Sequence, residues 1–276
     1  HSKNTYKFKK NKSDKIFIIL GVIYILILIS PLIALLARTL SFEIGNTQSH
    51  VSELFSNQKG SYFYLNPIAT IINSFKFALG TLFISIILGT ISSYLVANRT
   101  NRAKNHLIDA LLMLPLGVSS IALGLGYILA WNTPPFDLRG SWIIIIIAHS
   151  LIAYPFVMRS VLPAIQQINP NLREVATLLG SSTKKVFYKI DLPLITPSLI
   201  VGSTFAFAIS IGEFGASLLL VKPEFTTMPV AIYRFLGLPG DENLKNALVM
   251  SSILMCTVII GFICIEKLRY KNIGTF

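Results

Sequence analysis

Two short stretches, Glu174–Gly180 (EVATLLG) and Ile190–Pro193 (IDLP), stand nine residues apart within an otherwise apolar part of the chain. Pro170 suits the first turn of a helix, and Gly180 suits the left-handed residue that ends one. A serine after the glycine can cap a second short helix, which the two following prolines are expected to stop. The pattern therefore predicts two short helices joined by a tight turn and exposed between apolar segments. We call residues 170–193 the knuckle.

The spacing within the knuckle resembles the cytoplasmic signature of permease subunits of binding-protein-dependent ABC importers. That signature reads Glu-Ala-Ala, three residues, Gly, nine residues, Ile-x-Leu-Pro, and Val175 is a mild departure from it. The resemblance implies an ATPase-coupling motif, because in that family the knuckle docks on an ATPase subunit and carries its motion into the membrane. The alternative is an ordinary surface helix-turn-helix between membrane spans. The matching positions are Glu174, Ala176, Gly180, Ile190, Leu192 and Pro193.

The composition is that of a membrane protein. The 276 residues are 53% hydrophobic and only 13% charged, whereas a soluble domain carries about 25% charged residues. Several apolar runs approach the roughly 20 residues that cross a bilayer as a helix. The net charge of +12 would suggest nucleic acid in a soluble protein, but cytoplasmic loops of membrane proteins concentrate Lys and Arg. We expect an all-α polytopic membrane protein that binds no nucleic acid.

Six apolar segments set the expected topology. The spans are predicted at residues 16–37, 67–97, 108–131, 141–159, 197–221 and 246–265. Pro115 is expected to kink the third span, and residues 229–236 are expected to form a short interfacial helix. Of the 24 Lys and Arg residues, 17 lie in segments that this topology places inside and six outside. The positive-inside rule then puts both termini and the knuckle in the cytoplasm.

The spans divide the chain into three regions. Residues 1–66 are expected to hold a cytoplasmic flank, the first span and an external loop. Residues 67–266 would form the transmembrane core, with a coupling loop at 160–196 between the fourth and fifth spans, and 267–276 a cytoplasmic tail. The chain begins with His1, and some permeases of the class that it resembles are double-length, with two six-span halves in one chain. It would therefore suit the C-terminal half of such a permease.

The sequence predicts a transport subunit that is not an enzyme. It has no Gly-x4-Gly-Lys-Ser/Thr phosphate loop, so we expect ATP to be bound by a partner subunit and no cofactor to be bound by this chain. No metal-ligand cluster or nucleophile–base pair is evident, so no catalytic or metal-binding residue is predicted. Cys256 and Cys264 lie in one apolar segment and are read as small core residues.

Glu213 is an acidic residue placed deep in an expected span. Carboxylates there are costly and usually face a bundle interior or a water-filled cavity. Glu213 could line a pathway for a cationic substrate, or it could make a structural hydrogen bond at a helix contact, and both interpretations stay open. His149 is more often a packing residue with hydrogen bonds than a ligand. The candidate translocation path comprises Ser210, Gly212, Glu213 and His149.

The end of the fifth span and the loop that follows it make the resemblance more specific. Residues 212–216 (GEFGA) and 223–233 (PEFTTMPVAIY) look most similar to the ferric-iron and thiamine permease branch. That similarity implies ferric iron or thiamine as substrate, with sulfate, molybdate and polyamine permeases as close neighbours.

The resemblance also implies partners and a location. The partners would be ABC ATPase subunits, a second permease half (the same chain, a different one or a fused one) and an extracytoplasmic substrate-binding protein. The location would be the inner or plasma membrane, crossed several times. Two alternatives come from other classes: an ion-coupled secondary transporter that uses Glu213 or His149 as a proton site, and a membrane scaffold that transports nothing.

Overall fold

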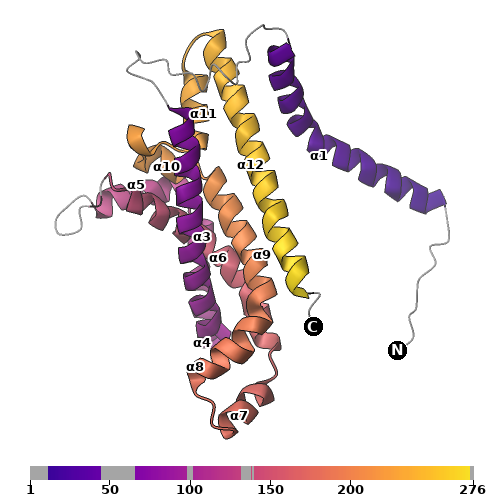
Figure 1. The fold of residues 1–276 in the computed structure, drawn as a ribbon, viewed down its shortest axis with the longest axis vertical. Coiled ribbons are helices and arrows are strands. Elements are labelled where there is room, and N and C mark those ends of the chain that lie inside the picture. Colours follow the sequence, from indigo (N-terminus) through magenta and orange to yellow (C-terminus); the bar gives the residue numbers. More distant parts are fainter. Residues whose placement is uncertain (1–11, 45–65, 98–101, 132–137, 139, 274–276) are drawn as a thin grey trace.

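The structure is a computed structural model, and every regular element in the part of the chain that it describes is a helix (Figure 1). It describes residues 12–44, 66–97, 102–131, 138 and 140–273. Within these residues, five helices are long and apolar enough to cross a membrane, and a sharply bent pair makes a sixth span if counted as one. This confirms the all-α polytopic prediction. The elements are α1 (Lys12–Ile44), α3 (Pro67–Ala97), α4 (Arg102–Met113), η1 (Leu114–Gly117), α5 (Ser120–Ala130), α6 (Trp142–Gln167), α7 (Pro170–Leu178), α8 (Thr183–Val186), η2 (Phe187–Asp191), α9 (Leu192–Gly212), α10 (Gly215–Leu220), η3 (Pro223–Phe225), α11 (Met228–Gly237) and α12 (Asp241–Ile273).

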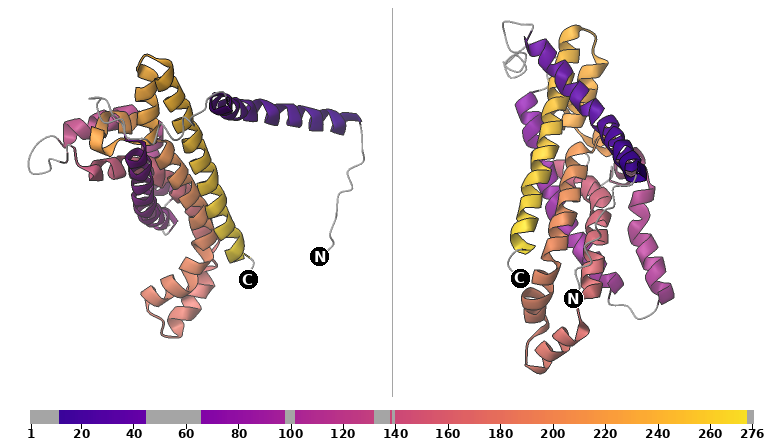
Figure 2. Two further views of the ribbon diagram at one scale, coloured as in Figure 1. Left: turned by 45° about the horizontal axis from the view of Figure 1, so that its top comes forward. Right: turned by 90° about the vertical axis from the view of Figure 1, so that its right-hand side faces the viewer.

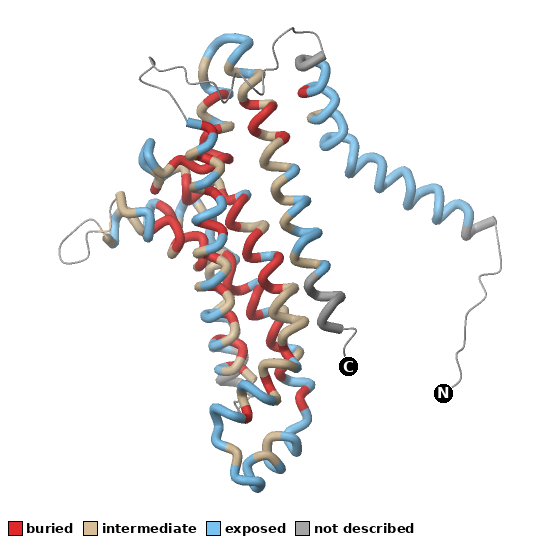
Figure 3. Tube along the Cα trace, viewed as in Figure 1, coloured by how far each residue is buried: buried red, intermediate tan, exposed pale blue. Residues whose placement is uncertain are grey.

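The centre of the bundle is α6, which packs between α3 and α9. Val157, fully buried on α6, has a glycine on each side. A Cβ atom at Gly89 of α3 would lie 2.6 Å from the Val157 Cβ, and one at Gly202 of α9 would lie 2.9 Å from its Cα. Small residues allow helices to approach this closely in a membrane. Figure 3 shows the buried positions gathered along these three helices, which form the scaffold of the knuckle.

The third span differs from its prediction. Instead of one kinked helix over 108–131, two helical pieces meet at an angle of 98° around residues 117–120. Pro115 lies in the 3-10 turn η1, where it has no N–H to donate, and Val118 and Ser119 are then extended. A proline alone bends a helix, but two extended residues end it. The result is two short helices, α4 and α5.

The fifth span also differs from its prediction, at both ends. The expected span of 197–221 stops at Gly212, Glu213 is extended, and α10 starts anew at Gly215. At the other end, α8, η2 and α9 run together from Thr183 to Gly212. The second short helix of the knuckle is therefore continuous with the span, although a stop at Pro193 was expected. The turn η2 just before that proline is a π-helix, and such a widened turn can accommodate the proline ring.

The outermost helix of the described chain is α1, which lies mostly apart from the bundle (Figures 1 and 2). None of its most apolar stretch is buried inside the structure. It meets α12 near its C-terminal end, where the hydroxyls of Thr39 and Ser252 are 2.9 Å apart. The two cysteines of α12 are likewise exposed rather than in the core. Lipid is as apolar as a protein core, so hydropathy alone does not separate the two environments.

The end of the bundle opposite the knuckle is closed by α11, which agrees with the short helix expected at 229–236. It is not merely interfacial, since Met228, Ala231 and Phe235 are buried against α12. Side chains of α3 fix the segment before it. Ser74 accepts a hydrogen bond from the Met228 N–H at 2.8 Å, and Asn73 donates to the Glu224 carbonyl at 2.9 Å. This end is therefore tied directly to the core.

Candidate functional site

The first half of the knuckle ends in the turn that the sequence predicts. Gly180 has φ of +79°, in the left-handed region that favours glycine. Its N–H donates to the Thr177 carbonyl at 2.9 Å, and the Ser181 N–H donates to the Ala176 carbonyl at 3.0 Å. These two bonds form a Schellman motif, which satisfies the last carbonyls of α7. At the other end, the Asn169 side chain caps α7 by accepting from the Asn171 N–H.

The turn presents an apolar surface outward. Leu178 is 87% exposed and Leu179 81% exposed, while Leu172 and Val175 of the same helix are about half exposed. We call these four leucine and valine residues the docking face. Large apolar side chains gathered at the tip of a charged loop mark an interaction surface more often than a solvated one. Glu174 and Gly180 lie beside this face and are also exposed.

The second half of the motif turns inward. Leu192 packs against the buried cluster that holds Val157, Val161 and Ile195, at the knuckle end of α6 and α9. Ile190 lies in the π-helical turn, and Pro193 occupies the first turn of α9. The six matching residues therefore fall in two environments: the positions around Gly180 are exposed, and Ile190, Leu192 and Pro193 are half-buried, with Leu192 against the core.

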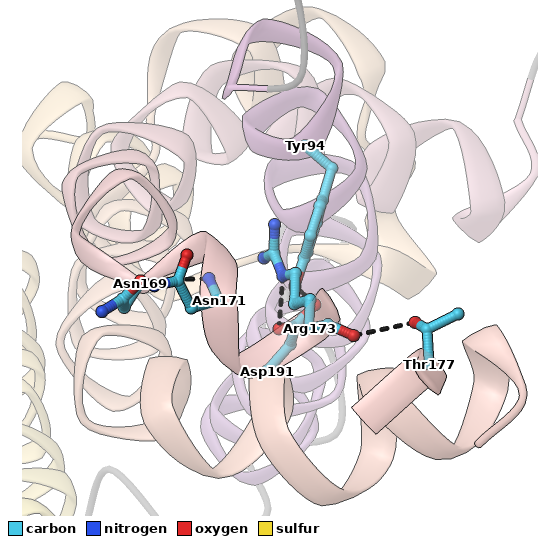
Figure 4. A network of polar contacts seen from close by, with 6 residues as sticks. All are labelled: Tyr94, Asn169, Asn171, Arg173, Thr177 and Asp191. Carbon is cyan, nitrogen blue, oxygen red and sulfur yellow. Dashed lines mark hydrogen bonds and ion pairs between the residues drawn. The ribbon is translucent and has the colours of Figure 1, made fainter. Parts of the chain in front are cut away.

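A polar cluster joins these two ends, and sequence reasoning missed it. Asp191 is 5% exposed, and both of its carboxylate oxygens accept hydrogen bonds. The Arg173 Nε of α7 donates to Oδ1 at 2.9 Å, and the Tyr94 hydroxyl of α3 donates to Oδ2 at 3.0 Å. Figure 4 shows both side chains reaching Asp191 from their separate helices. The sequence held one signal for this cluster, a charged residue between apolar neighbours in IDLP.

Beside this cluster lies a cavity of about 800 Å³ between α7 and the α8–η2 segment. Its walls combine aromatic and basic side chains. Phe187 contacts the Tyr94 ring with 6.0 Å between centroids, and the Arg173 guanidinium carbon lies 5.9 Å from the Tyr94 ring centre. The cavity leaves α7 without continuous packing on that side. The lining residues are Tyr94, Arg173, Thr177, Thr183, Lys184, Val186, Phe187, Tyr188 and Asp191.

The predicted translocation residues meet where the fifth span breaks. The Glu213 side chain accepts a hydrogen bond from the Ala216 N–H at 2.7 Å, so it satisfies a free donor at the start of α10. His149 is fully buried on α6, with its Nδ1 2.9 Å from the Ser210 hydroxyl and its Nε2 2.8 Å from the Ser217 hydroxyl. Both ring nitrogens are thus engaged in joining α6 to the two pieces of the span.

The breaks in the third and fifth spans lie against each other. Helix α10 packs on α5, and a side chain at Gly215 would collide with Ser120. Gly212, one of the predicted path residues, is exposed, whereas Ser210 and Glu213 are buried. The structure thus gives Glu213 and His149 definite structural partners, and their place on a pathway stays a prediction. Within the described residues, no group of three or more potential metal ligands is found.

Comparison with known proteins gives the context of these sites. Residues 82–266 match the family described as "Binding-protein-dependent transport system inner membrane component". The molybdenum transport system permease protein ModB of Haemophilus influenzae is 28% identical over 205 residues, which are 69% of this chain and 89% of that protein. The putative 2-aminoethylphosphonate transport system permease protein PhnV of Salmonella paratyphi A is 26% identical over 161 residues, 58% of this chain and 59% of PhnV.

The fold is shared with solved transporters. A chain from the crystal structure of a bacterial alginate ABC transporter, in complex with an alginate pentasaccharide-bound periplasmic protein, superposes with a TM-score of 0.69 at 20% identity. The superposition covers 91% of each chain. Since the family match covers more than half of the sequence and includes the whole knuckle, this chain belongs to the family of binding-protein-dependent transport system inner membrane components.

Proposed function

We propose that the chain forms one half of the pathway of an ATP-driven importer and takes its driving force through the knuckle. The observation that carries this proposal is the docking face, where Leu178 is 87% exposed at the tip of a motif whose other half is anchored in the core. A surface of this kind needs a partner to cover it. The chain has no phosphate loop of its own, so the partner would be an ATPase subunit.

The proposed mechanism follows from the structure of the knuckle, which has an exposed tip around Gly180 and a second half that is continuous with α9. Closure of two ATPase subunits on ATP would move two knuckles together, and each knuckle would move the adjoining ends of α3 and α9 with it. The spans would then alternate between inward and outward opening. The knuckle motif occurs once in this chain, so a second permease half would supply the other. An extracytoplasmic binding protein would deliver substrate at the end closed by α11.

We further propose a tetrahedral oxyanion as substrate. ModB and PhnV are named for molybdenum and for 2-aminoethylphosphonate; dissolved molybdenum is molybdate, and a phosphonate also presents a tetrahedral oxygen-bearing group. These two relatives give no support to ferric iron or thiamine, the substrates that the sequence resemblance favours. Molybdate was among the alternatives, and it now comes first.

Uptake measurements test this proposal. Cells that carry the intact importer should accumulate labelled molybdate or 2-aminoethylphosphonate, and cells that lack this chain should not. Depletion of ATP with the proton gradient maintained should stop uptake. Uptake that continues without ATP would refute the importer, and accumulation of ferric iron or thiamine with neither anion would refute the substrate class.

The orientation of the chain is a separate proposal. The knuckle and the C-terminal end of α12 lie at one end of the bundle (Figure 1), and the knuckle carries Lys184, Lys185 and Lys189. By the positive-inside rule we place this end, with both termini, in the cytoplasm. Most of the cytoplasmic flank expected at 1–15 and of the external loop expected at 38–66 lies outside the described residues, while 12–15 and 38–44 belong to α1.

Cysteine labelling checks the orientation. In a background with Cys256 and Cys264 replaced by serine, Asn243→Cys should react with an impermeant thiol reagent added outside. Ser182→Cys should react only after the membrane is opened, because Ser182 lies in the exposed turn of the knuckle. Labelling of position 182 from outside would reverse the proposed orientation.

A further inference from the structure

Helix α7 is weakly held by packing. It contacts chiefly α8, which is a single turn, and the cavity of about 800 Å³ separates it from the neighbouring segment on one side. Its outward surface is the docking face, where Leu178 and Leu179 are more than 80% exposed and Leu172 and Val175 about half exposed. A helix held only in this way would swing about the Gly180 turn when pulled. Some other contact must carry force from α7 into the bundle if the knuckle is to act as a lever.

The Asp191 cluster is placed to be that contact. Asp191 lies at the junction of η2 and α9, Arg173 on α7 and Tyr94 on α3. Hydrogen bonds to an ionised group are the strong ones, and a buried carboxylate is costly unless it is satisfied. Asp191 keeps both of its oxygens bonded only while α7 and α3 stay in place. The three elements are therefore held at fixed distances by one buried charge.

We propose that Arg173, Asp191 and Tyr94 form a clamp that makes α7 rigid with α3 and α9, so that displacement of the knuckle by an ATPase moves the spans. This inference deepens the proposed function and rests on it. Without the clamp, the knuckle would still bind its partner through the docking face. Displacement of α7 by the ATPase would then bend the turn at Gly180 instead of moving the spans. ATP would be hydrolysed with little transport.

A distance measurement tests the clamp without any partner. Spin labels at Asn171→Cys on α7 and Leu95→Cys on α3, both exposed positions, should give a narrow distance distribution in the purified chain with Cys256 and Cys264 replaced by serine. Asp191→Asn and Tyr94→Phe should broaden it. Tyr154→Phe is the matched control, since it removes another hydroxyl that bonds across helices, to the Leu112 carbonyl. An unchanged distribution in both clamp variants would overturn the proposal.

A coupling measurement tests the consequence. In liposomes holding the importer purified through this chain, molybdate moved per ATP hydrolysed should fall about tenfold in Asp191→Asn and in Arg173→Gln, the scale of losing a hydrogen bond to a charged group. ATPase binding should stay unchanged. Arg173→Lys should restore most of the coupling, because Arg173 reaches Asp191 through Nε alone and one cation can replace another there.

The outcomes separate the two proposals. If complexes of the unsubstituted chain bind no ATPase, the proposed function is refuted. The distance measurement would still show whether the clamp exists. If the parent hydrolyses ATP but moves no molybdate, the substrate class fails and the clamp is again decided by distance. If ATPase binding and molybdate transport are normal in the parent and transport per ATP is unchanged in Asp191→Asn, the clamp is refuted and the importer stands.

Discussion

Leu178→Asp is expected to abolish ATP-driven uptake while the membrane core stays folded. Leu178 is 87% exposed in the structure, so the substitution removes little packing within the chain. On docking, however, a buried leucine contributes about 1.5–3 kcal/mol, and an aspartate in its place would bring an unpaired charge into an apolar groove at a further cost. The lost burial of leucine and the unpaired charge together should lower the affinity for an ATPase subunit by more than a hundredfold. The conversion is that each 1.4 kcal/mol of binding free energy changes the affinity about tenfold.

Asn171→Asp provides the matched control. It places the same charge on the same helix, at an exposed position outside the docking face, and near the N-terminus, where a negative charge is favourable. Both variants should elute as the parent does in size-exclusion chromatography. Pull-down of the ATPase and uptake of molybdate should be lost only for Leu178→Asp. Equal uptake by the two variants would show that the docking face is not the site of coupling.

Glu213→Leu is expected to lower the stability of the folded chain, and Glu213→Gln is expected to leave both stability and uptake close to those of the parent. The carboxylate accepts the Ala216 N–H at 2.7 Å in a buried site, so leucine leaves that donor without a partner, at a cost of about 1–3 kcal/mol. Glutamine retains an acceptor oxygen of the same reach. Thermal unfolding in detergent and uptake in liposomes measure the two effects.

The same pair of substitutions at Glu224 is the control, because Glu224 is exposed in η3. Neither variant there should shift the unfolding temperature. A folded Glu213→Gln variant that transports nothing would instead show that the charge itself is needed, and would place Glu213 on the pathway. An oxyanion substrate argues against that result, since a carboxylate lining the path would repel it.

Much of this architecture could be predicted from the sequence, because it depends on patterns over neighbouring residues. The second span was predicted at 67–97, and α3 has the same bounds. The end of α7 at Gly180 was also predicted, since a left-handed residue after an amphipathic helix is a local feature. The motif spacing gave the family of importers, which the match over residues 82–266 confirms. The roles of its residues in coupling, and of Glu213 in transport, stay predictions.

Other features were decided by tertiary structure alone. Apolar runs predict how much chain can cross a membrane, but they do not show where a run breaks. The 98° bend in the third span and the restart after Glu213 become favourable because α5 and α10 pack on each other and the Glu213 side chain accepts the free Ala216 N–H. Likewise, Asp191 was read as the variable position of a motif. Its partner Tyr94 lies 97 residues away in the sequence, and helical periodicity relates only residues a few positions apart. The contact between them exists because Gly89 and Gly202 let α3, α6 and α9 approach closely enough to bring the ends of α3 and α9 together.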